Sequence, residues 1–423
     1  MELPHSRFKL RENRGGERMP EPEQSTPKAP IFRRMVFYIP GYDPFHPRRY
    51  RELYRKEGAD QARISGYQID LKPKSGKGPY GWHATTQIDG VQSEADIGVL
   101  VWSDIVKTSM ERGIAGTYLQ LVRTAWAYIS SGALFRLMRL RKGPMIAALY
   151  PIVFLLAQLA VALLLGGALA VFTSQVHSIL GAGLGFGLAW AILAAFRRWD
   201  NKVFAYYLMH DYAYSAQIGG ANPPELEARM TEFRTALRAA LTQGFDEVLV
   251  VGHSSGAHLG VSILADLLRD GLPKGASALG FLSLGQVVPM VSFLPKAQRL
   301  RGDLTYMAAQ DQVAWIDVTA PGDGCAFALC DPVSVTGVAP QVKLWPLVVS
   351  AAFTQSLSAA RWGELRWRFF RLHFQYLCAF DRPKDYDYFQ ITAGALTLRD
   401  RYAGRVASKS RIERPLSGYR DVA

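Results

Sequence analysis

The sequence predicts an α/β protein, in which a mostly parallel β-sheet is flanked by helices and interrupted by two apolar membrane helices. Three observations predict this fold class. Short apolar runs typical of buried strands alternate with helical patterns along most of the chain. One such run, Glu247–Val251, leads directly into Gly252-His253-Ser254-Ser255-Gly256 and then into a helical pattern. Between residues 143 and 196 the chain contains no Asp, Glu, Lys or Arg.

The strands and helices of the first part follow from alternation and turn residues. The run Met35–Ile39 predicts a strand that ends in the turn Pro40–Pro44, because Pro and Gly terminate strands. Further on, alternating runs around Ile64–Leu71 and Trp82–Ile88 predict a hairpin whose loop covers residues 72–81. A polar helix from Arg48 to about Gln61 and a strand at Ile97–Trp102 complete this part.

The second part continues the same alternation. Asn222 is expected to cap a helix that runs to Thr242, with proline in its first turn. Two later apolar runs predict strands at Leu279–Leu284 and Val313–Thr319, with a helix between them over residues 296–310.

The uncharged segment is long enough for two membrane spans of about 20 residues each. We expect the spans at Met145–Phe172 and roughly Ser178–Phe196, joined by the turn Thr173–His177. Basic residues flank both outer ends and are absent from the turn, so the positive-inside rule places the catalytic domain and both termini on the cytoplasmic side. The alternative is a pair of helices buried inside a soluble core.

The expected organisation is one domain with an insertion. Residues 1–30 are polar and predict a disordered tail, and residues 31–142 form the first part of the α/β domain. Residues 143–198 form the transmembrane hairpin, residues 199–398 complete the domain, and residues 399–423 form a basic C-terminal tail.

Composition narrows the class of partner. The net charge of +13 is compatible with nucleic acid, but the sequence contains no recognition module, so we expect no nucleic-acid partner. An anionic membrane surface explains the charge better in a chain with a membrane segment. The three cysteines have neither metal-binding spacing nor a disulfide framework, which is typical of a reducing compartment, and neither metal nor cofactor is predicted.

The Gly-x-Ser-x-Gly segment stands where a nucleophile would stand. A strand, a tight turn of small residues and a helix are the context in which Ser254 would project from the carboxyl edge of the sheet. The alternative is a plain turn between a strand and a helix.

A serine nucleophile requires a base, and elimination leaves one histidine. Of the eight histidines only His258 and His373 follow Ser254, and His258 lies within the helix after the turn. We therefore expect His373 to be the base; the alternative is a histidine buried in an aromatic helix.

The acid that orients the base should follow the strand containing Trp315. Asp323 lies in the Pro/Gly turn just after this strand and is the preferred candidate, whereas Asp317 lies within the strand. Asp331 is the reserve acid, and the alternative for it is a turn residue.

Charge that develops on a substrate oxygen needs fixed hydrogen-bond donors. The backbone N–H of Ser255 is one candidate donor of this oxyanion hole. Gly41 permits close approach of the backbone after the first strand, and Tyr42 would supply the second N–H. The alternative is an ordinary turn.

The segments Val36–Pro44, Glu247–Gly256 and Trp315–Asp323, together with His373, resemble the α/β-hydrolase superfamily of the esterase and lipase kind. The resemblance implies a serine hydrolase working through an acyl-enzyme, with Ser254 as nucleophile, His373 as base and Asp323 as orienting acid. This chain departs from the family in its strand order, in its Pro-Gly-Tyr turn and in the membrane hairpin within the domain.

The sequence therefore predicts a membrane-anchored serine hydrolase that cleaves a hydrophobic carboxylic ester, with membrane lipids as partners and possible substrates. The alternative is a catalytically silent domain that binds or assembles other molecules at the membrane. A transporter is disfavoured, because it would require ionisable residues within the spans or several more spans.

Overall fold

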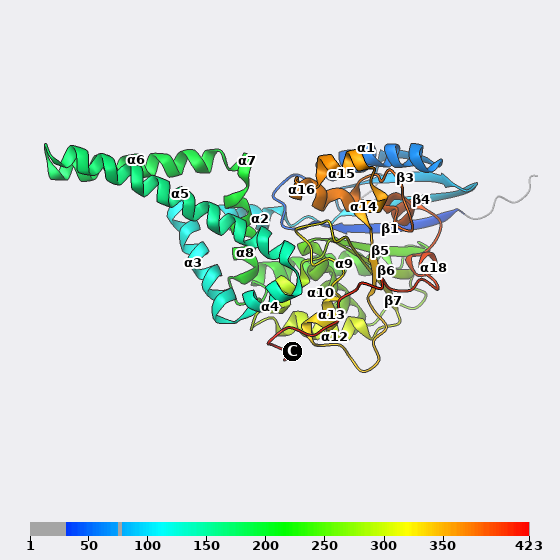
Figure 1. Cartoon of the computed structure of the whole chain (residues 1–423). Helices are drawn as coiled ribbons and strands as arrows, with labels where there is room; N and C mark the ends of the chain where they lie inside the picture. The colour runs from blue at the N-terminus through cyan, green and yellow to red at the C-terminus, as the bar shows by residue number, and fades with distance from the viewer. Residues whose placement is uncertain (1–30, 75–77, 423) are drawn as a thin grey trace, which may run out of the picture. The chain divides into compact units, whose positions relative to one another are not determined.

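The computed structural model describes residues 31–74 and 78–422. The tail predicted at residues 1–30 and the centre of the predicted loop at residues 72–81 lie outside this range. The chain forms an eight-stranded sheet with the order β2-β3-β4-β1-β5-β6-β7-β8 (Figure 1). Its strands are β1 (Phe32–Ile39), β2 (Gln68–Pro73), β3 (Gly81–Ile88), β4 (Val91–Val99), β5 (Glu247–His253), β6 (Ala278–Leu284), β7 (Val313–Thr319) and β8 (Leu347–Ser350).

The sheet is mostly parallel. Strands β4, β1, β5, β6, β7 and β8 pair in parallel, and only the edge strands β2 and β3 introduce antiparallel pairing. The predicted α/β class with a mostly parallel sheet flanked by helices is confirmed. Because all these parallel strands end at the same edge, the segments that follow β1, β5 and β7 are brought together.

Helices cover both faces of the sheet, so the central strands are buried on both sides. Along β5, Val248 and Val250 belong to one apolar layer, and Leu249 and Val251 belong to the other. The first layer includes α9 (Pro224–Ala240), α10 (Ser255–Arg269), α11 (Val288–Ser292), α12 (Gln298–Ala308) and α13 (Pro332–Thr336). The second includes α1 (Arg48–Ser65), α14 (Phe353–Ser356), α15 (Ala359–Leu365), α16 (Phe369–His373), η1 (Phe374–Leu377), α17 (Tyr388–Ala393) and α18 (Leu398–Arg401).

A buried ion pair joins β1 to β5. The Arg34 guanidinium donates to Glu247 at 2.6 Å, and both side chains are fully buried. Arg34 also donates to the carbonyl oxygens of Gly394 and Leu396, and Glu247 accepts the N–H of Leu398. Each of the two charges therefore has several partners. Removing either Arg34 or Glu247 would leave the charge of the other buried and uncompensated.

Three predicted boundaries are wrong for identifiable reasons. The fourth strand begins at Val91 rather than Ile97, because Asp89-Gly90 forms a two-residue turn with positive φ at both residues. The first helix continues to Ser65, so the strand predicted from Ile64 starts at Gln68. Asn222 does not cap α9, because Pro223 takes the N-cap position and Asn222 donates to Glu227 instead.

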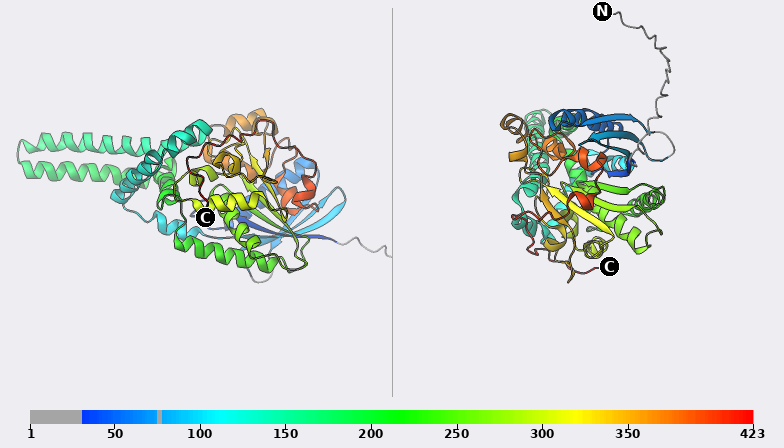
Figure 2. Two further views of the ribbon diagram at one scale, coloured as in Figure 1. Left: turned by 90° about the horizontal axis from the view of Figure 1, so that it is seen from below. Right: turned by 90° about the vertical axis from the view of Figure 1, so that its right-hand side faces the viewer.

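Seven helices lie between β4 and α9 in sequence. Helices α5 and α6 are each long and apolar enough to cross a membrane. They run side by side in Figure 1 and in the left view of Figure 2. Most of their apolar side chains are exposed. The seven helices are α2 (Ser103–Met110), α3 (Ile114–Ser130), α4 (Ala133–Leu140), α5 (Lys142–Ser174), α6 (Ser178–Arg198), α7 (Asp200–Val203) and α8 (Ala205–Ala216).

Small residues allow α5 and α6 to pack closely. A Cβ atom added to Gly166 would lie 2.5 Å from the Gly185 carbonyl oxygen, and one added to Gly185 would lie 2.5 Å from that of Gly166. Close backbone contact of this kind is the arrangement by which helices attract each other in a bilayer, where the hydrophobic effect between them is absent.

The C-terminal segment is docked on the domain. Ile412 forms a parallel bridge with Cys330, and Asp421 pairs with the buried Arg301 at 2.9 Å. The segment predicted as a basic tail therefore makes defined contacts with the domain.

We expect Gly166→Ala to lower the thermal unfolding midpoint of the detergent-solubilised protein, because overpacking costs about 1–3 kcal/mol. Gly167→Ala is the matched control, since a Cβ there would meet nothing within 4 Å. Equal midpoints for the two variants would contradict the close helix contact.

Candidate active site

Ser254 lies at a sharp bend between β5 and α10. Its φ and ψ are 57° and −121°, a left-handed conformation that is unfavourable for any residue with a Cβ atom. At the neighbouring glycines the backbone of other segments comes so close that a side chain would not fit. A Cβ on Gly256 would lie 2.1 Å from the Ile39 carbonyl oxygen, and one on Gly252 would lie 2.6 Å from that of Gly256. The geometry is that of the predicted strand–turn–helix elbow.

The turn after β1 lies against Ser254. A Cβ on Gly41 would be 2.9 Å from the Cβ of Ser254, so only glycine fits without displacement. The turn is fixed from both sides, because the Trp102 indole donates to the Pro40 carbonyl at 2.9 Å and the Tyr207 hydroxyl donates to the Tyr42 carbonyl. The amides of Tyr42 and Ser255 thus lie on rigid segments beside the serine, while their role as oxyanion donors stays a prediction.

His373 and Asp323 form a buried pair. The Nδ1 of His373 lies 2.8 Å from Oδ2 of Asp323, across 50 residues of sequence. Asp323 also accepts the Tyr376 hydroxyl at 3.0 Å and the Cys325 amide at 2.8 Å. Burial acts to raise the pKa of Asp323, but the facing imidazole and these donors outweigh burial and lower it. Asp323 is therefore held as a carboxylate that orients the ring.

The two other candidate acids lie elsewhere. Asp317 is buried within β7, where it accepts the Ser283 hydroxyl at 2.6 Å, and burial raises its pKa to about 8. Asp331 caps α13 by accepting the amides of Val333 and Ser334, and it pairs with Lys343. Neither is hydrogen-bonded to His373, so the preference for Asp323 over Asp331 agrees with the geometry.

Ser254 and His373 line one cavity of about 80 Å³. The Nε2 of His373, the ring nitrogen opposite Asp323, is buried and has no hydrogen-bond partner among the described residues. It is therefore free to accept a proton from a group in the cavity. Apolar side chains on the cavity wall include Leu208, Met290, Phe370 and Phe374, and Pro144 comes from the first turn of α5.

The two other histidines near the site, His253 and His258, are buried and packed within the structure. His253 is buried beside Ser254, and its Nε2 lies 3.0 Å from the His373 carbonyl oxygen, which fixes the backbone of the base. Burial and the neighbouring His373 lower its pKa to about 3, so its ring is neutral. His258 packs within α10 as expected, and burial lowers its pKa to about 4.

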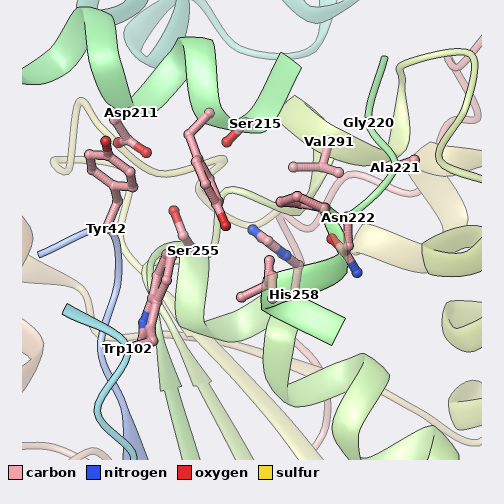
Figure 3. Close-up of a pocket in the computed structure, with 13 residues that line it drawn as sticks. Tyr42, Trp102, Asp211, Ser215, Gly220, Ala221, Asn222, Ser255, His258 and Val291 are labelled. Atoms are coloured by element: carbon pink, nitrogen blue, oxygen red, sulfur yellow. The ribbon is translucent and has the colours of Figure 1, made fainter. Parts of the chain in front are cut away.

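A second, smaller cavity adjoins the first. Figure 3 shows the Ser255 hydroxyl and the His258 ring turned into it, with Asp211 and Tyr42 beside them. Tyr42, Asp211, Ser215 and Ser255 line both cavities, so these residues form the wall between them.

Two residues of the site were missed by the sequence analysis. Tyr376, which donates to Asp323, lies three residues after His373, and a helical spacing of three was the available signal. Asp211 lies on α8 with no hydrogen-bond partner for its carboxyl group among the described residues, and burial raises its pKa to about 7. No sequence signal placed α8 over the site.

The donor atoms of Asp323, Cys325 and His373 lie within 4.8 Å of one another, a spacing that a metal ion also accepts. The Asp323 carboxylate and His373 Nδ1 are, however, already bonded to each other. Burial raises the pKa of the Cys325 thiol, and a neutral thiol is a poor metal ligand. These three groups are therefore better explained as a hydrogen-bonded histidine–carboxylate pair with a neutral thiol nearby than as a metal site.

No protein-family model, curated protein or solved structure matches this chain.

We expect Ser254→Gly to be more stable than Ser254→Ala by on the order of 1 kcal/mol. Glycine relieves backbone strain of about 1–3 kcal/mol, which exceeds its entropic cost of about 0.5–1 kcal/mol. Alanine also lacks the hydroxyl but keeps the Cβ, so it is the matched comparison. Thermal unfolding checks the order, and a less stable glycine variant would show that the bend is unstrained.

Asp211 should make stability fall as pH rises. Because its folded pKa of about 7 exceeds the value of an unfolded aspartate, the folded state holds an extra proton between about pH 4 and pH 7. The free energy of unfolding therefore falls as pH rises across this window, and the loss is complete above pH 7. Asp211→Asn, which stays neutral, should raise the unfolding midpoint more at pH 8 than at pH 5.

The control is Asp311→Asn, at a side chain that is 81% exposed. Its effect should be the same at both pH values. A pH-independent effect of Asp211→Asn would contradict the shifted pKa.

Proposed function

We propose that this protein is a membrane-anchored serine hydrolase that cleaves a hydrophobic carboxylic ester through an acyl-enzyme on Ser254. The observation that carries the proposal is the shared cavity, which is lined by a strained serine and by an aspartate-bound histidine whose Nε2 has no hydrogen-bond partner among the described residues. A nucleophile, a base and an orienting acid with these partners define the serine hydrolase arrangement.

The mechanism follows from the positions of the groups. His373 Nε2 takes the proton of Ser254 Oγ as the oxygen attacks the ester carbonyl carbon, and Asp323 stabilises the resulting imidazolium. The N–H groups of Ser255 and Tyr42 bind the oxyanion. His373 then returns the proton to the departing alcohol, and a water molecule activated by the same base releases the acid.

The sheet supports a relationship to the α/β-hydrolase superfamily. The nucleophile follows the central strand β5, the acid follows β7, and the base follows β8, in the chain order typical of that superfamily. The antiparallel strands β2 and β3 follow β1 in sequence but still occupy one edge of the sheet. This chain therefore differs from the superfamily in the order in which the strands are connected, while the antiparallel strands keep their place at the edge of the sheet.

The apolar wall and the position of α5 favour an apolar substrate. Pro144 lies in the first turn of α5, so the cavity opens at the domain end of the two apolar helices. Basic residues at both ends of this insertion favour the cytoplasmic side for the domain. A lipid ester from the adjacent leaflet matches both the lining and the location, and hydrolysis is the default because water is the commonest acceptor.

A fluorophosphonate probe tests the nucleophile directly. We expect labelling of the full-length protein in detergent, with its loss in Ser254→Ala and a decrease of about 10⁴-fold in labelling rate in Asp323→Asn, as for triad carboxylates elsewhere. Ser255→Ala is the matched control, because the adjacent residue keeps its backbone N–H and should retain labelling.

Absence of labelling in a correctly folded protein would contradict the hydrolase. That outcome would favour a silent domain that binds or assembles other molecules at the membrane.

A further inference from the structure

Helices α3 and α4 carry an apolar face that points away from the protein. On α3 the residues lie at spacings of three and four, which places them on one side of the helix. The six side chains expose 45–71% of their surface: Leu119, Val122, Trp126 and Ile129 on α3, and Phe135 and Met138 on α4. We name this set the α3–α4 face.

Helix α3 carries large apolar side chains on both of its sides, unlike a helix on a water-exposed surface. Its inward side buries Thr117 and Thr124 together with Ile114, Leu121 and Tyr128, while its outward side presents tryptophan and aliphatic residues. An exposed apolar patch of this kind indicates a surface that is covered in the working protein.

The face is continuous with the two apolar helices. Ile114 packs against Ala162 and Leu193, and the Tyr118 hydroxyl donates to the Leu155 carbonyl at 2.9 Å. In Figure 1, α3 leaves the side of α5 and crosses the direction of the hairpin towards α4.

The depth of α3 can be derived from helix geometry. From Leu155 to Ser174 the rise along α5 is about 29 Å, close to the ~30 Å thickness of a bilayer core. Leu155, and with it Tyr118, therefore lies at the boundary of the apolar core when the hairpin spans the bilayer. The α3–α4 face continues from this level.

The charge around the face has one sign. Between Glu111 and Asp200 the sequence contains no acidic residue. None of the basic residues in this interval forms an ion pair with a described residue: Arg112, Arg123, Arg136, Arg139, Arg141, Lys142, Arg197 and Arg198. Such a set complements anionic lipid headgroups, each contact contributing about 1 kcal/mol.

We propose that the α3–α4 face is seated in the interface of an anionic bilayer, so that the domain lies flat on the leaflet beside its own hairpin. An interfacial helix with aromatic and aliphatic residues on one side and arginines nearby binds membranes in this way.

The seating deepens the proposed function by placing the cavity within reach of lipid. One side of α8 packs on α3, where Met209 and Leu121 belong to one apolar cluster, and its other side carries Tyr207 and Asp211 at the cavity. Only one helix therefore separates the membrane-bound face from the candidate active site. This step, unlike the seating itself, rests on the hydrolase proposal.

The seating is tested by a nitroxide side chain at residue 122 in the full-length protein, reconstituted in vesicles of phosphatidylcholine and phosphatidylglycerol. The matched control is residue 342, also a valine, 71% exposed and in a loop of the domain. Collisions with oxygen should exceed those with a water-soluble nickel complex at residue 122 and not at residue 342. The unsubstituted chain, treated with the same reagent, supplies the background from its own cysteines.

Two outcomes would overturn the seating. If residue 122 resembles residue 342, the face lies in water. If residue 122 is shielded from both reagents, the face is covered by protein, such as a second copy of this chain.

A second measurement separates the seating from catalysis. Val122→Glu should lower turnover of a phospholipid ester in the same vesicles about tenfold and leave turnover of a short soluble ester unchanged, whereas Val342→Glu should change neither. Equal loss on both esters in Val122→Glu would assign a structural role and overturn the route from the leaflet. If neither ester is cleaved by the unsubstituted protein, the hydrolase proposal fails, while the nitroxide result still decides the seating.

Discussion

The closest backbone approach at the site is between the end of β1 and the bend after β5. At Gly256 and at Gly41 there is no room for a side chain, so the two segments touch through backbone atoms. This contact fixes the serine and the turn beside it relative to each other, because neither can move without the other. The position of Ser254 is thus set by the backbone, independently of the histidine–aspartate pair. A strained conformation at Ser254 persists because the surrounding packing determines it completely.

The insertion between β4 and β5 contains the two helices that are long and apolar enough to cross a membrane. Helix α8, which follows the two apolar helices, lies between α3 and the cavity, so one short helix contacts both of them. Its Asp211 lines the cavity with a carboxyl group that has no hydrogen-bond partner among the described residues, so this wall carries a polar group as well as packing residues. The wall therefore combines a packing role with a chemical environment for whatever occupies the cavity.

The sequence predicted the features that are local or unique in number. The elbow follows from five consecutive residues, His373 from the small number of histidines, and the two apolar helices from the absence of charge. Features that depend on three-dimensional neighbours were missed, as with Asp211, which is placed by α8 packing, and with the outward side of α3. The Asp89-Gly90 turn is different, because its signal was present in the residues and was overlooked.

The pairing of β1 with β5 has a consequence for biosynthesis. Arg34 and Glu247, which join these strands, are 213 residues apart, so at ordinary translation rates roughly 10–40 s separate their appearance. During this interval one edge of the nascent sheet has open backbone groups, and such edges recruit other chains. Insertion of the two apolar helices falls within the same interval. Fragments that end after α6 contain β1 without its neighbour β5 and expose two apolar helices, so they should be the species that aggregate.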